Sequence, residues 1–288
     1  MNRAQRVETI PSMRELIASW RHSGPIGFVP TMGALHSGHV RLIQQARDEC
    51  ARVVVSIFIN PLQFDRQDDL DRYPRTLEAD AATAEEIGVD ALFLPGVAEM
   101  YAAPPACTVD PGPLATHLCG AYRPGHFRGV ATVVLKLLNI IAADRAYFGN
   151  KDGQQLAIVK RMVADFNLPV TIVGVPTVRE ADGLALSSRN VRLQQRERLL
   201  APRLYQALQT ADRLITDGEP AADLVKRAAI AALGTDDLLK LEYLEVVDPR
   251  DLQPVAVVTG PVMVAAAAWV GDTRLIDNIV STPHAARH

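Results

Sequence analysis

Apolar residues in the first 178 positions alternate between short continuous runs and stretches in which they recur every three or four residues. A continuous run is typical of a strand buried on both faces, whereas the wider spacing is typical of a helix with one apolar face. The runs predict strands over residues 26–29, 53–59, 91–94, 145–149 and 170–175. The run over residues 53–59, VVVSIFI, is so rich in β-branched residues that a central strand is expected there.

Helical spacing fills the segments between these runs, so strands and helices alternate along the chain. The helices are predicted over residues 12–21, from 40 onward, and over 77–87, 129–142 and 153–167, with a loop over 95–113. Thr76 suits the N-cap of the helix over 77–87, and Gly88 suits its end. The alternation favours a parallel sheet with right-handed crossovers, and hence a Rossmann-like, doubly wound α/β fold.

The pattern changes after residue 178, where two helical stretches rich in arginine and alanine precede three apolar runs. The helices are predicted over residues 192–215 and 221–233, and the strands over 240–247, 263–270 and 275–279. We therefore predict a Rossmann-like domain over residues 1–178 and a smaller C-terminal α+β domain over residues 179–288. The tail, residues 281–288, is predicted to be disordered.

Composition narrows the functional classes. Of the 288 residues, 48% are hydrophobic and 22% are charged, which is the balance of a globular enzyme. The net charge of −3 gives no broad attraction to nucleic acid or to an anionic membrane, so neither is expected as a partner. The three cysteines lack CxxC pairing, and no signal-like N-terminus or membrane-length apolar run is visible, so a cytoplasmic protein without disulfides is expected.

The richest chemistry lies in residues 30–39, PTMGALHSGH, which we call the HxGH segment. It joins the first predicted strand of the sheet to a helix. Its two glycines allow a ligand to approach the backbone closely, and the unpaired N–H groups at the start of the helix attract phosphate. His36 and His39 add side-chain donors, so the segment is predicted to bind an anion. A chance match and a metal site are the alternatives, although no further ligands occur at zinc-like spacing.

Further polar residues follow other predicted strands, and they would meet at the same edge of the sheet. A site that handles phosphate needs positive charge, hydroxyl and N–H donors, and a carboxylate near Mg²⁺. Amides suit a small hydroxy acid, because they donate and accept hydrogen bonds without adding charge. The candidates are Asn60 with Gln63, Lys151 with Asp152 and Gln155, and the triplet Ser187-Ser188-Arg189. The carboxylate near Mg²⁺ could be Asp152 or, from the helix predicted over 77–87, Asp80.

Each of these clusters also has a simpler explanation. Lys151 and Asp152 could be a solvated surface pair, and the Ser187-Ser188-Arg189 triplet could be a polar loop with a helix cap. Arg123 and its neighbours could form a basic loop without a special role. Their joint occurrence in one Rossmann-like frame favours a single site.

Several stretches also resemble one family. PTMGALHSGH, FINPLQFD, RPGHFRGVATVV, YFGNKDGQQL and LALSSRN, in this order, look very much like pantothenate synthetases, the pantoate–β-alanine ligases of the HxGH nucleotidylyltransferase superfamily. The resemblance runs to about Asn190, and GDTRLIDN near the C-terminus is similar to the same family. Two residues depart from the usual pattern, Ser37 and Asn150, where glutamate is usual.

The resemblance implies an ATP-dependent ligase that condenses D-pantoate and β-alanine to pantothenate. Pantoate would first form pantoyl adenylate with release of pyrophosphate, and β-alanine would then displace AMP. It also implies Mg²⁺, a homodimer, and a C-terminal domain that acts as a lid. An adenylyltransferase that stops at nucleotide transfer and a non-catalytic nucleotide-binding module are the alternatives.

Residue roles are carried over from the same resemblance. His36, His39 and Lys151 would be catalytic, and Asp80 would reach Mg²⁺ through water. The residues that would bind pantoate and β-alanine are Asn60, Gln63, Arg123 and Gln155. The residues that would line the ATP site are Met32, Gly33, Ala34, Leu35, His36, Ser37, Gly38, His39, Gly149, Asn150, Lys151, Asp152, Val178, Leu186, Ser187, Ser188 and Arg189.

Overall fold

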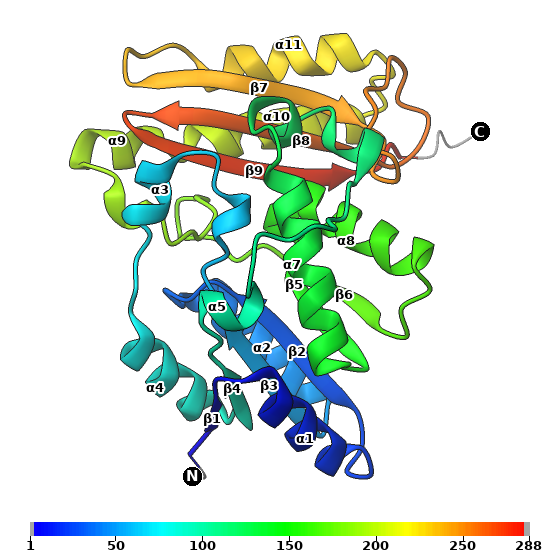
Figure 1. The fold of residues 1–288 in the computed structure, drawn as a ribbon. Helices are drawn as coiled ribbons and strands as arrows, with labels where there is room; N and C mark the ends of the chain where they lie inside the picture. Colours follow the sequence, from blue (N-terminus) through cyan, green and yellow to red (C-terminus); the bar gives the residue numbers. More distant parts are fainter. Residues whose placement is uncertain (1–2, 285–288) are drawn as a thin grey trace. The chain divides into compact units, whose positions relative to one another are not determined.

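A computed structural model of the chain describes residues 3–284, which form two compact units (Figure 1). The first unit comprises the described residues up to Gly112 together with Arg123–Gly149 and Ile158–Pro176. The second comprises Pro113–Tyr122, Asn150–Ala157 and the described residues from Thr177 onward. The predicted division into residues 1–178 and 179–288, which assigns one continuous segment to each domain, stays a prediction.

A six-stranded parallel sheet forms the centre of the first unit, with the strand order β1-β4-β3-β2-β5-β6. Its strands are β1 (Gln5–Val7), β2 (Ile26–Thr31), β3 (Arg52–Ile57), β4 (Ala91–Phe93), β5 (Arg145–Gly149) and β6 (Thr171–Val175). The strand order reverses between β2 and β5, so the carboxyl end of β2 lies at the switch point where ligands of doubly wound sheets bind. The predicted fold class is confirmed.

Helices cover both faces of this sheet. The longer ones are α1 (Ile10–Trp20), α2 (Ser37–Glu49), α4 (Leu77–Ile87), α7 (His126–Ile141) and α8 (Gly153–Asp165), and the short ones are η1 (Pro61–Gln63), α3 (Gln67–Asp71) and α5 (Val97–Met100). Helices α2 and α4 pack together over one face, where Val29, Ile43 and Val55 share a buried core. Helices α1 and α7 pack together, and α7 also packs against β2.

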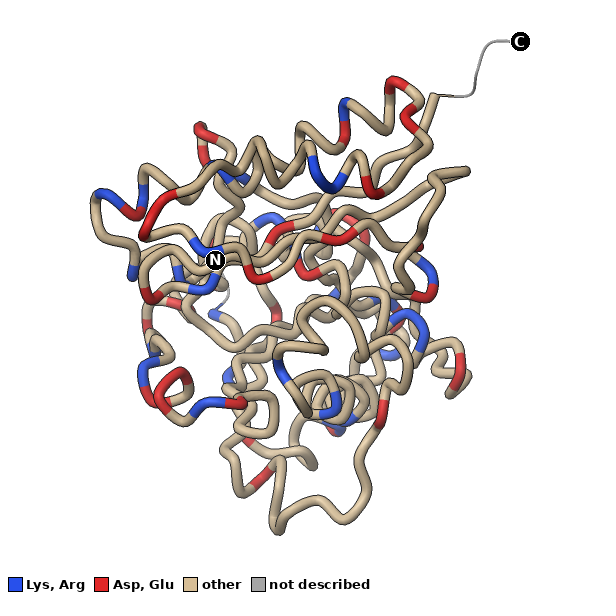
Figure 2. The backbone as a smooth tube through the Cα atoms, turned by 90° about the horizontal axis from the view of Figure 1, so that it is seen from above, with Lys and Arg blue, Asp and Glu red and all other residues tan. Residues whose placement is uncertain are grey.

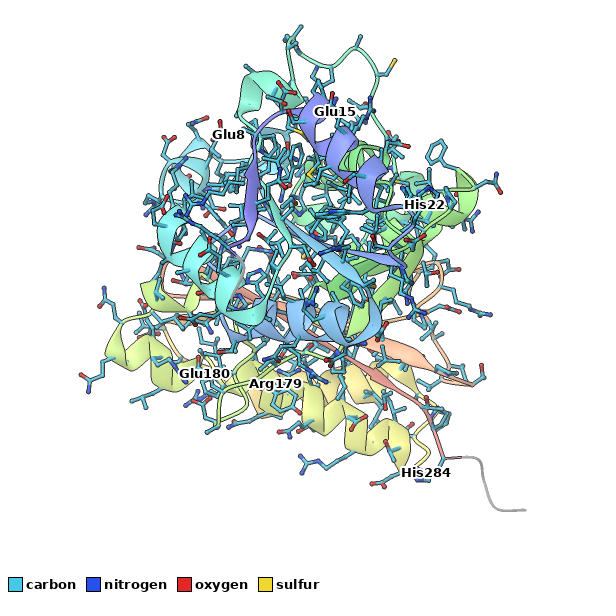
Figure 3. All side chains as sticks on the ribbon, turned by 90° about the horizontal axis from the view of Figure 1, so that it is seen from below. Glu8, Glu15, His22, Arg179, Glu180 and His284 are labelled. Atoms are coloured by element: carbon cyan, nitrogen blue, oxygen red, sulfur yellow. The ribbon has the colours of Figure 1, made fainter. Side chains whose placement is uncertain are left out.

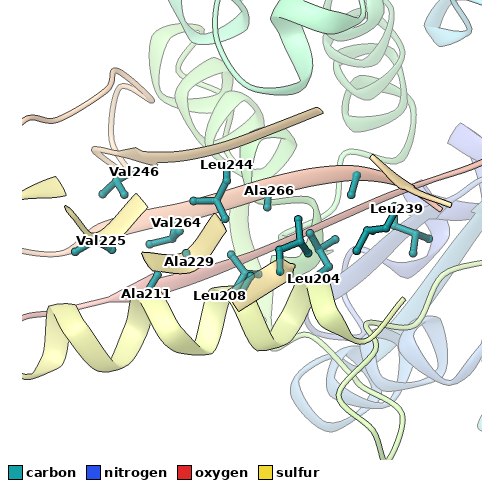
Figure 4. Close-up of a cluster of buried hydrophobic side chains, with 14 of the residues drawn as sticks. Leu204, Leu208, Ala211, Val225, Ala229, Leu239, Leu244, Val246, Val264 and Ala266 are labelled. Carbon is teal, nitrogen blue, oxygen red and sulfur yellow. The ribbon is translucent and has the colours of Figure 1, made fainter. Parts of the chain in front are cut away.

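The second unit is built on an antiparallel sheet of β7 (Leu239–Val247), β8 (Val262–Val270) and β9 (Thr273–Ser281). Its helical elements are η2 (Gly112–Ala115), α6 (Cys119–Tyr122), η3 (Asn150–Asp152), η4 (Asn190–Arg192), α9 (Gln195–Leu200), α10 (Arg203–Thr216) and α11 (Ala222–Leu233). Leu208 and Ala211 of α10 and Val225 of α11 pack on Leu244 and Val264 of the sheet (Figure 4). This is the smaller α+β unit that the C-terminal pattern predicted.

One strand was missed, and two predicted elements differ from the structure in number or extent. Strand β1 was missed, because its three residues, QRV, offer no apolar run and two of them are exposed. The single helix predicted over residues 192–215 is instead η4, α9 and α10. Pro202 lies at the break between α9 and α10, where it has no N–H to donate to the preceding turn. The loop predicted over residues 95–113 contains α5 and the start of η2.

Element ends differ from the predictions in smaller ways. Gly88 ends α4 in the left-handed conformation, with φ of 84°, as predicted, but the side chain of Thr76 caps no N–H group. Strand β3 stops at Ile57, and strand β9 extends to Ser281, the first residue of the predicted disordered tail. Residues 282–284 have no regular structure, and residues 285–288 lie outside the described residues.

Acidic and basic residues are both scattered along the backbone (Figure 2), in line with the small net charge of −3. Among the described residues, no helix is both long enough and apolar enough to cross a membrane.

Candidate active site

The HxGH segment forms a tight turn between β2 and α2 whose shape is set by hydrogen bonds to its backbone. Gly33 and Ala34 both adopt positive φ, 83° and 51°, which is unusual for alanine. The carboxylate of Asp80 accepts the N–H groups of Ala34 and Leu35 at 2.9 and 2.7 Å. Thr31 accepts the N–H of Gly33 at 3.2 Å. These contacts hold the left-handed turn in place.

Both histidines lie at the start of α2, side by side, with ring centroids 4.1 Å apart. Nδ1 of His36 accepts the N–H of Gly38 at 3.1 Å, and Nδ1 of His39 accepts the N–H of His36 at 3.3 Å. A neutral imidazole that accepts through Nδ1 carries its proton on Nε2. Each neutral ring is thereby a donor through Nε2, as an anion-binding turn requires, and the catalytic role of the pair stays a prediction.

Asp80 was predicted to reach a metal ion through water, but its observed contacts are with the protein. Its side chain is buried, with 3% of the residue exposed. Besides the two N–H groups of the turn, it accepts a hydrogen bond from Thr76, 3.2 Å from each of its oxygens. Among residues 3–284, no three or more His, Cys, Asp or Glu side chains are grouped to hold a metal ion. The metal role stays a prediction, and the contacts assign Asp80 to the turn.

Asp80→Asn tests that assignment. The amide has one acceptor oxygen, and its NH₂ group would face an N–H donor. We therefore expect the free energy of unfolding to fall by about 1–3 kcal/mol relative to the wild type. Thermal melts with and without ATP would measure the loss. Glu86→Gln, an exposed position on the same helix, is the control. A variant as stable as the wild type, with a defect cured by raising Mg²⁺, would favour the metal role instead.

Asn60 lies at the centre of a hydrogen-bond network at the carboxyl end of β3. It is 1% exposed. Its Nδ2 group donates to the Gly129 carbonyl at 3.1 Å and to Oε1 of Gln63 at 3.0 Å, and its Oδ1 accepts from Tyr101 at 2.9 Å. The described contacts of Asn60 are thus made with the protein, and its predicted contact with substrate stays a prediction.

Gln63 joins this network to the HxGH segment. Because Asn60 donates to its Oε1, the Nε2 group of Gln63 is free to point the other way, and it donates to Sδ of Met32 at 3.3 Å. The structure therefore brings together two clusters that are 31 residues apart in sequence. An amide whose donor faces the HxGH segment would suit a carboxylate ligand, and the predicted substrate role of Gln63 stays a prediction.

Two residues that support Asn60 were missed in the sequence. A Cβ atom on Gly129 would lie 2.2 Å from the Leu62 carbonyl oxygen, so α7 can approach η1 only because this residue is glycine. Gly129 falls in the stretch RPGHFRGVATVV, but nothing local indicated a close approach. Tyr101 lies within the loop predicted over residues 95–113, and burial raises its pKa to about 12, so it remains a hydrogen-bond donor at neutral pH.

Arg123, another predicted substrate residue, braces the same loop. Its guanidinium donates to Asp65 at 2.7 and 2.9 Å and to the Gln63 carbonyl at 3.2 Å. Nδ1 of His126 also donates to that carbonyl, at 2.7 Å. Arg123 therefore holds the loop that carries Gln63, and its predicted contact with substrate stays a prediction.

The Arg123–Asp65 pair should make stability depend on pH. Burial raises the pKa of Asp65, but the hydrogen bonds and charge of Arg123 outweigh burial and leave that pKa below its usual value. Such a group stabilises the fold above its unfolded pKa, about 3.9, and this stabilisation is lost as pH falls through the lowered pKa. We expect Arg123→Ala to lower Tm at pH 7, and the Tm difference from the wild type to shrink below about pH 3.9.

Melting curves between pH 7 and pH 2.5 would follow this difference. Arg128→Ala removes a more exposed partner, paired with Asp110 at 2.9 Å, and should change Tm little throughout. A difference between wild type and Arg123→Ala that is constant over the whole range would contradict the assignment.

In the second unit, Lys151 lies in η3, between β5 and α8. Its ammonium is 3.5 Å from Asp152, and the side chain is 19% exposed. The carbonyls of Asn150 and Lys151 accept hydrogen bonds from Asn278 of β9. Gln155 is half-buried on the following turn. Asn278 was not singled out in the sequence, although it ends the quoted GDTRLIDN stretch.

The remaining predicted ATP residues lie in a hairpin and the turn that follows it. The N–H of Leu186 donates to the Val178 carbonyl at 3.0 Å, and the next residue, Ser187, accepts the N–H of Arg189 at 3.2 Å. Arg179, on the same segment (Figure 3), pairs with the buried Asp277 of β9. Burial raises the pKa of Asp277, against the opposing effect of the Arg179 charge.

The predicted residues thus fall into two groups, one in each unit. The first unit brings together Met32–His39, Asp80, Asn60, Gln63 and Arg123, and the second brings together Asn150–Asp152 and Val178–Arg189 through β9. A parallel sheet with a strand–turn–helix segment at its switch point is the architecture of nucleotide-binding proteins of the doubly wound α/β class.

Comparison with known families narrows this class. The family model described as pantoate-beta-alanine ligase matches residues 5–280, and the chain belongs to that family. It is 49% identical to the pantothenate synthetase of Thermotoga petrophila, over 95% of this chain and 98% of that protein. It is 51% identical, over 97% of its length, to a bifunctional pantoate ligase/cytidylate kinase of a Synechococcus species, but covers 52% of that protein. The chain thus spans about half the length of such bifunctional relatives.

Solved structures agree with the family assignment. Pantothenate synthetase from Thermus thermophilus is 47% identical, with a TM-score of 0.89, and the match covers 96% of this chain and 98% of that one. Pantoate-beta-alanine ligase from Francisella tularensis, solved in complex with beta-gamma ATP and beta-alanine, is 34% identical, with a TM-score of 0.79 and coverage of 96% and 97%.

Proposed function

We propose that this chain is a pantothenate synthetase, an ATP-dependent ligase that joins D-pantoate and β-alanine through a pantoyl-adenylate intermediate. The observation that carries the proposal is the match to pantothenate synthetases along both units, at 49% identity over 95% of the chain. The relative from Francisella tularensis was solved with beta-gamma ATP and beta-alanine, which supports ATP and β-alanine as substrates of this chain.

In the first half-reaction, a carboxylate oxygen of pantoate attacks the α-phosphorus of ATP, and the bond to pyrophosphate breaks. Negative charge builds up on the phosphate oxygens as this happens, so fixed donors aimed at them lower the barrier. The Nε2 groups of His36 and His39, together with the dipole of α2, would provide such donors in the first unit. The donor group of Gln63 would hold the pantoate carboxylate.

In the second half-reaction, the amine of β-alanine attacks the acyl carbon, and AMP leaves as the C–O bond to the adenylate breaks. The acyl phosphate is a far better electrophile than the free carboxylate, which is why the reaction consumes ATP. Lys151, with Ser187, Ser188 and Arg189, would neutralise the phosphate in both steps. Gln155 would share the binding of pantoate with Gln63.

The proposal includes Mg²⁺ bound together with ATP. One buried carboxylate, Asp80, supports the HxGH segment, which is too few ligands for a magnesium site built by protein alone. It is compatible with an ion held mainly by the phosphates of ATP. When bound, Mg²⁺ would neutralise part of their charge.

We also propose a cytoplasmic homodimer, in which the C-terminal domain acts as a lid, as the family resemblance implies. Light scattering would test the dimer, with an expected mass of about twice the 31.3 kDa of the chain.

Product formation with each combination of substrates tests the function. Pyrophosphate should appear from ATP and pantoate without β-alanine, in an amount equal to the enzyme, because the adenylate stays bound. Continuous release of AMP should require β-alanine as well. An adenylyltransferase would turn over without β-alanine, and a nucleotide-binding module would bind ATP without releasing either product. Either result would overturn the proposal.

A further inference from the structure

The GDTRLIDN stretch forms most of β9. Of two adjacent residues at its end, Asn278 contacts predicted ATP residues, and Asp277 contacts Arg179, the neighbour of the predicted ATP residue Val178. Asp277 is 4% exposed and pairs with Arg179, which lies 3.6 Å from the centre of the Tyr205 ring and also donates to the Gly183 carbonyl. Asn278 contacts the Lys151 turn instead. Since neighbouring side chains on a strand point to opposite faces, one strand can hold both segments.

Asn278 holds the backbone of the Lys151 turn by two hydrogen bonds. Its Nδ2 group donates to the carbonyl of Asn150 at 3.0 Å and to that of Lys151 at 2.7 Å. Its own N–H donates to Asp277 at 2.8 Å. A Cβ atom on Gly153 would lie 2.9 Å from Oδ1 of Asn278 and 2.8 Å from Sδ of Met263, so the turn is seated directly on the sheet.

The side chain of Lys151 is held far less firmly than its backbone. Its ammonium lies 3.5 Å from Asp152, at the limit of hydrogen-bond distance. A lysine side chain has four rotatable bonds and loses much conformational freedom when it is fixed. Where its ammonium can reach therefore depends mainly on where the turn places its Cα atom.

We propose that Asn278 is a positioning residue for Lys151: by donating to two successive carbonyls of η3, it fixes the turn on β9 so that the ammonium reaches the reacting phosphate. This inference rests on the proposed function. Displacement of a charged group by about 1 Å can cost about 10²-fold in rate. We therefore expect Asn278→Ala to lower kcat for adenylate formation by about 10–100-fold, with the KM for pantoate changed less than about threefold.

A double-mutant cycle with Lys151→Ala separates positioning from a general structural role. If Asn278 acts through Lys151, Asn278→Ala should cost little further activity once Lys151 is absent, whereas independent effects would add. Pyrophosphate release would be measured in single turnovers with excess enzyme, below the Tm of every variant. Val280→Ala, an exposed position further along the same strand (58% exposed), is the matched control and should keep wild-type rates.

Asn278→Ser keeps one hydroxyl donor and should recover part of the loss, and Asn278→Asp replaces the donors by acceptors and should be the least active. If Asn278→Ala does not fold, the serine variant takes its place in the cycle. A rate within twofold of the wild type, or losses that add in the cycle, would overturn the inference. These results leave the proposed function intact, whereas a wild-type chain that makes no adenylate would refute that function itself.

Discussion

Lys151→Ala is expected to slow pantoyl-adenylate formation by about 10³-fold while the fold remains stable. In the proposed mechanism, the ammonium would stabilise charge that develops when the α-phosphorus becomes five-coordinate, so its loss should raise the barrier more than it weakens binding of ATP. Removal of one such donor in an enzyme site typically costs about 10²–10³-fold. Rapid-quench measurement of pyrophosphate release in a single turnover would give the rate.

Two further variants define what the lysine supplies. Lys160→Ala removes an exposed lysine from the same stretch of chain and should leave the rate unchanged. Lys151→Arg keeps the charge but spreads it over a planar group, so it should restore only part of the rate. If Lys151→Ala raised the KM for ATP with kcat unchanged, Lys151 would be a binding residue and not one that acts on the transition state.

Most strands of the main sheet could be predicted, because a buried strand is indicated by the apolar run of its own residues. Strand β3, VVVSI preceded by Arg52, is buried along its length, and such strands read as continuous apolar runs. Strand β1 is the exception, because it is a three-residue strand at the sheet edge that pairs with β4. Its pairing partner lies about 85 residues further along the chain, so no local pattern indicates it.

The position of the two histidines could also be predicted from nearby residues, since a strand, a glycine-containing turn and a helix start are all visible within residues 26–43. The contacts that shape the turn could not be predicted in this way. Asp80 reaches it from α4, 45 residues away from Leu35, and a lone acidic residue in a helix carries no sign of its partner. The sequence therefore predicts only that this carboxylate reaches Mg²⁺ through water, which stays a prediction, and gives no sign of its contacts with the turn.

The other features that the sequence does not indicate depend on contacts between residues far apart in the chain. Asn60 follows a strand, where polar residues usually face a ligand, and its contacts with distant donors and acceptors of the protein could not be predicted locally. Gly129 and Asn278 matter through backbone carbonyls 67 and 127 residues away, at Leu62 and Lys151. Residue type alone does not show which carbonyl an amide or a glycine will meet.

Substitution of His39 is expected to give the second large loss of activity. Because its Nδ1 and Nε2 atoms face different partners, its structural role can be separated from its proposed catalytic role. His39→Ala should abolish pyrophosphate release that depends on pantoate, with a loss of about 10²–10⁴-fold. It should also cost about 1 kcal/mol of stability, because Nδ1 of His39 accepts the N–H of His36 at 3.3 Å. Single-turnover pyrophosphate release and thermal melts would measure the two losses. His22→Ala, an exposed histidine in the same unit (Figure 3), is the control and should change neither.

Two amide variants distinguish a fixed donor from a general acid. Asparagine places its amide where Nδ1 lies, so His39→Asn should keep the hydrogen bond to His36 and the stability but lose the donor at Nε2. Glutamine places an N–H group near Nε2, so His39→Gln should retain about 10-fold more activity than His39→Asn if the ring stabilises phosphate charge, because a neutral amide donates a hydrogen bond without giving up a proton. Equal loss in both variants, with a pH–rate profile that loses its acidic group, would instead make His39 a proton donor to the departing pyrophosphate.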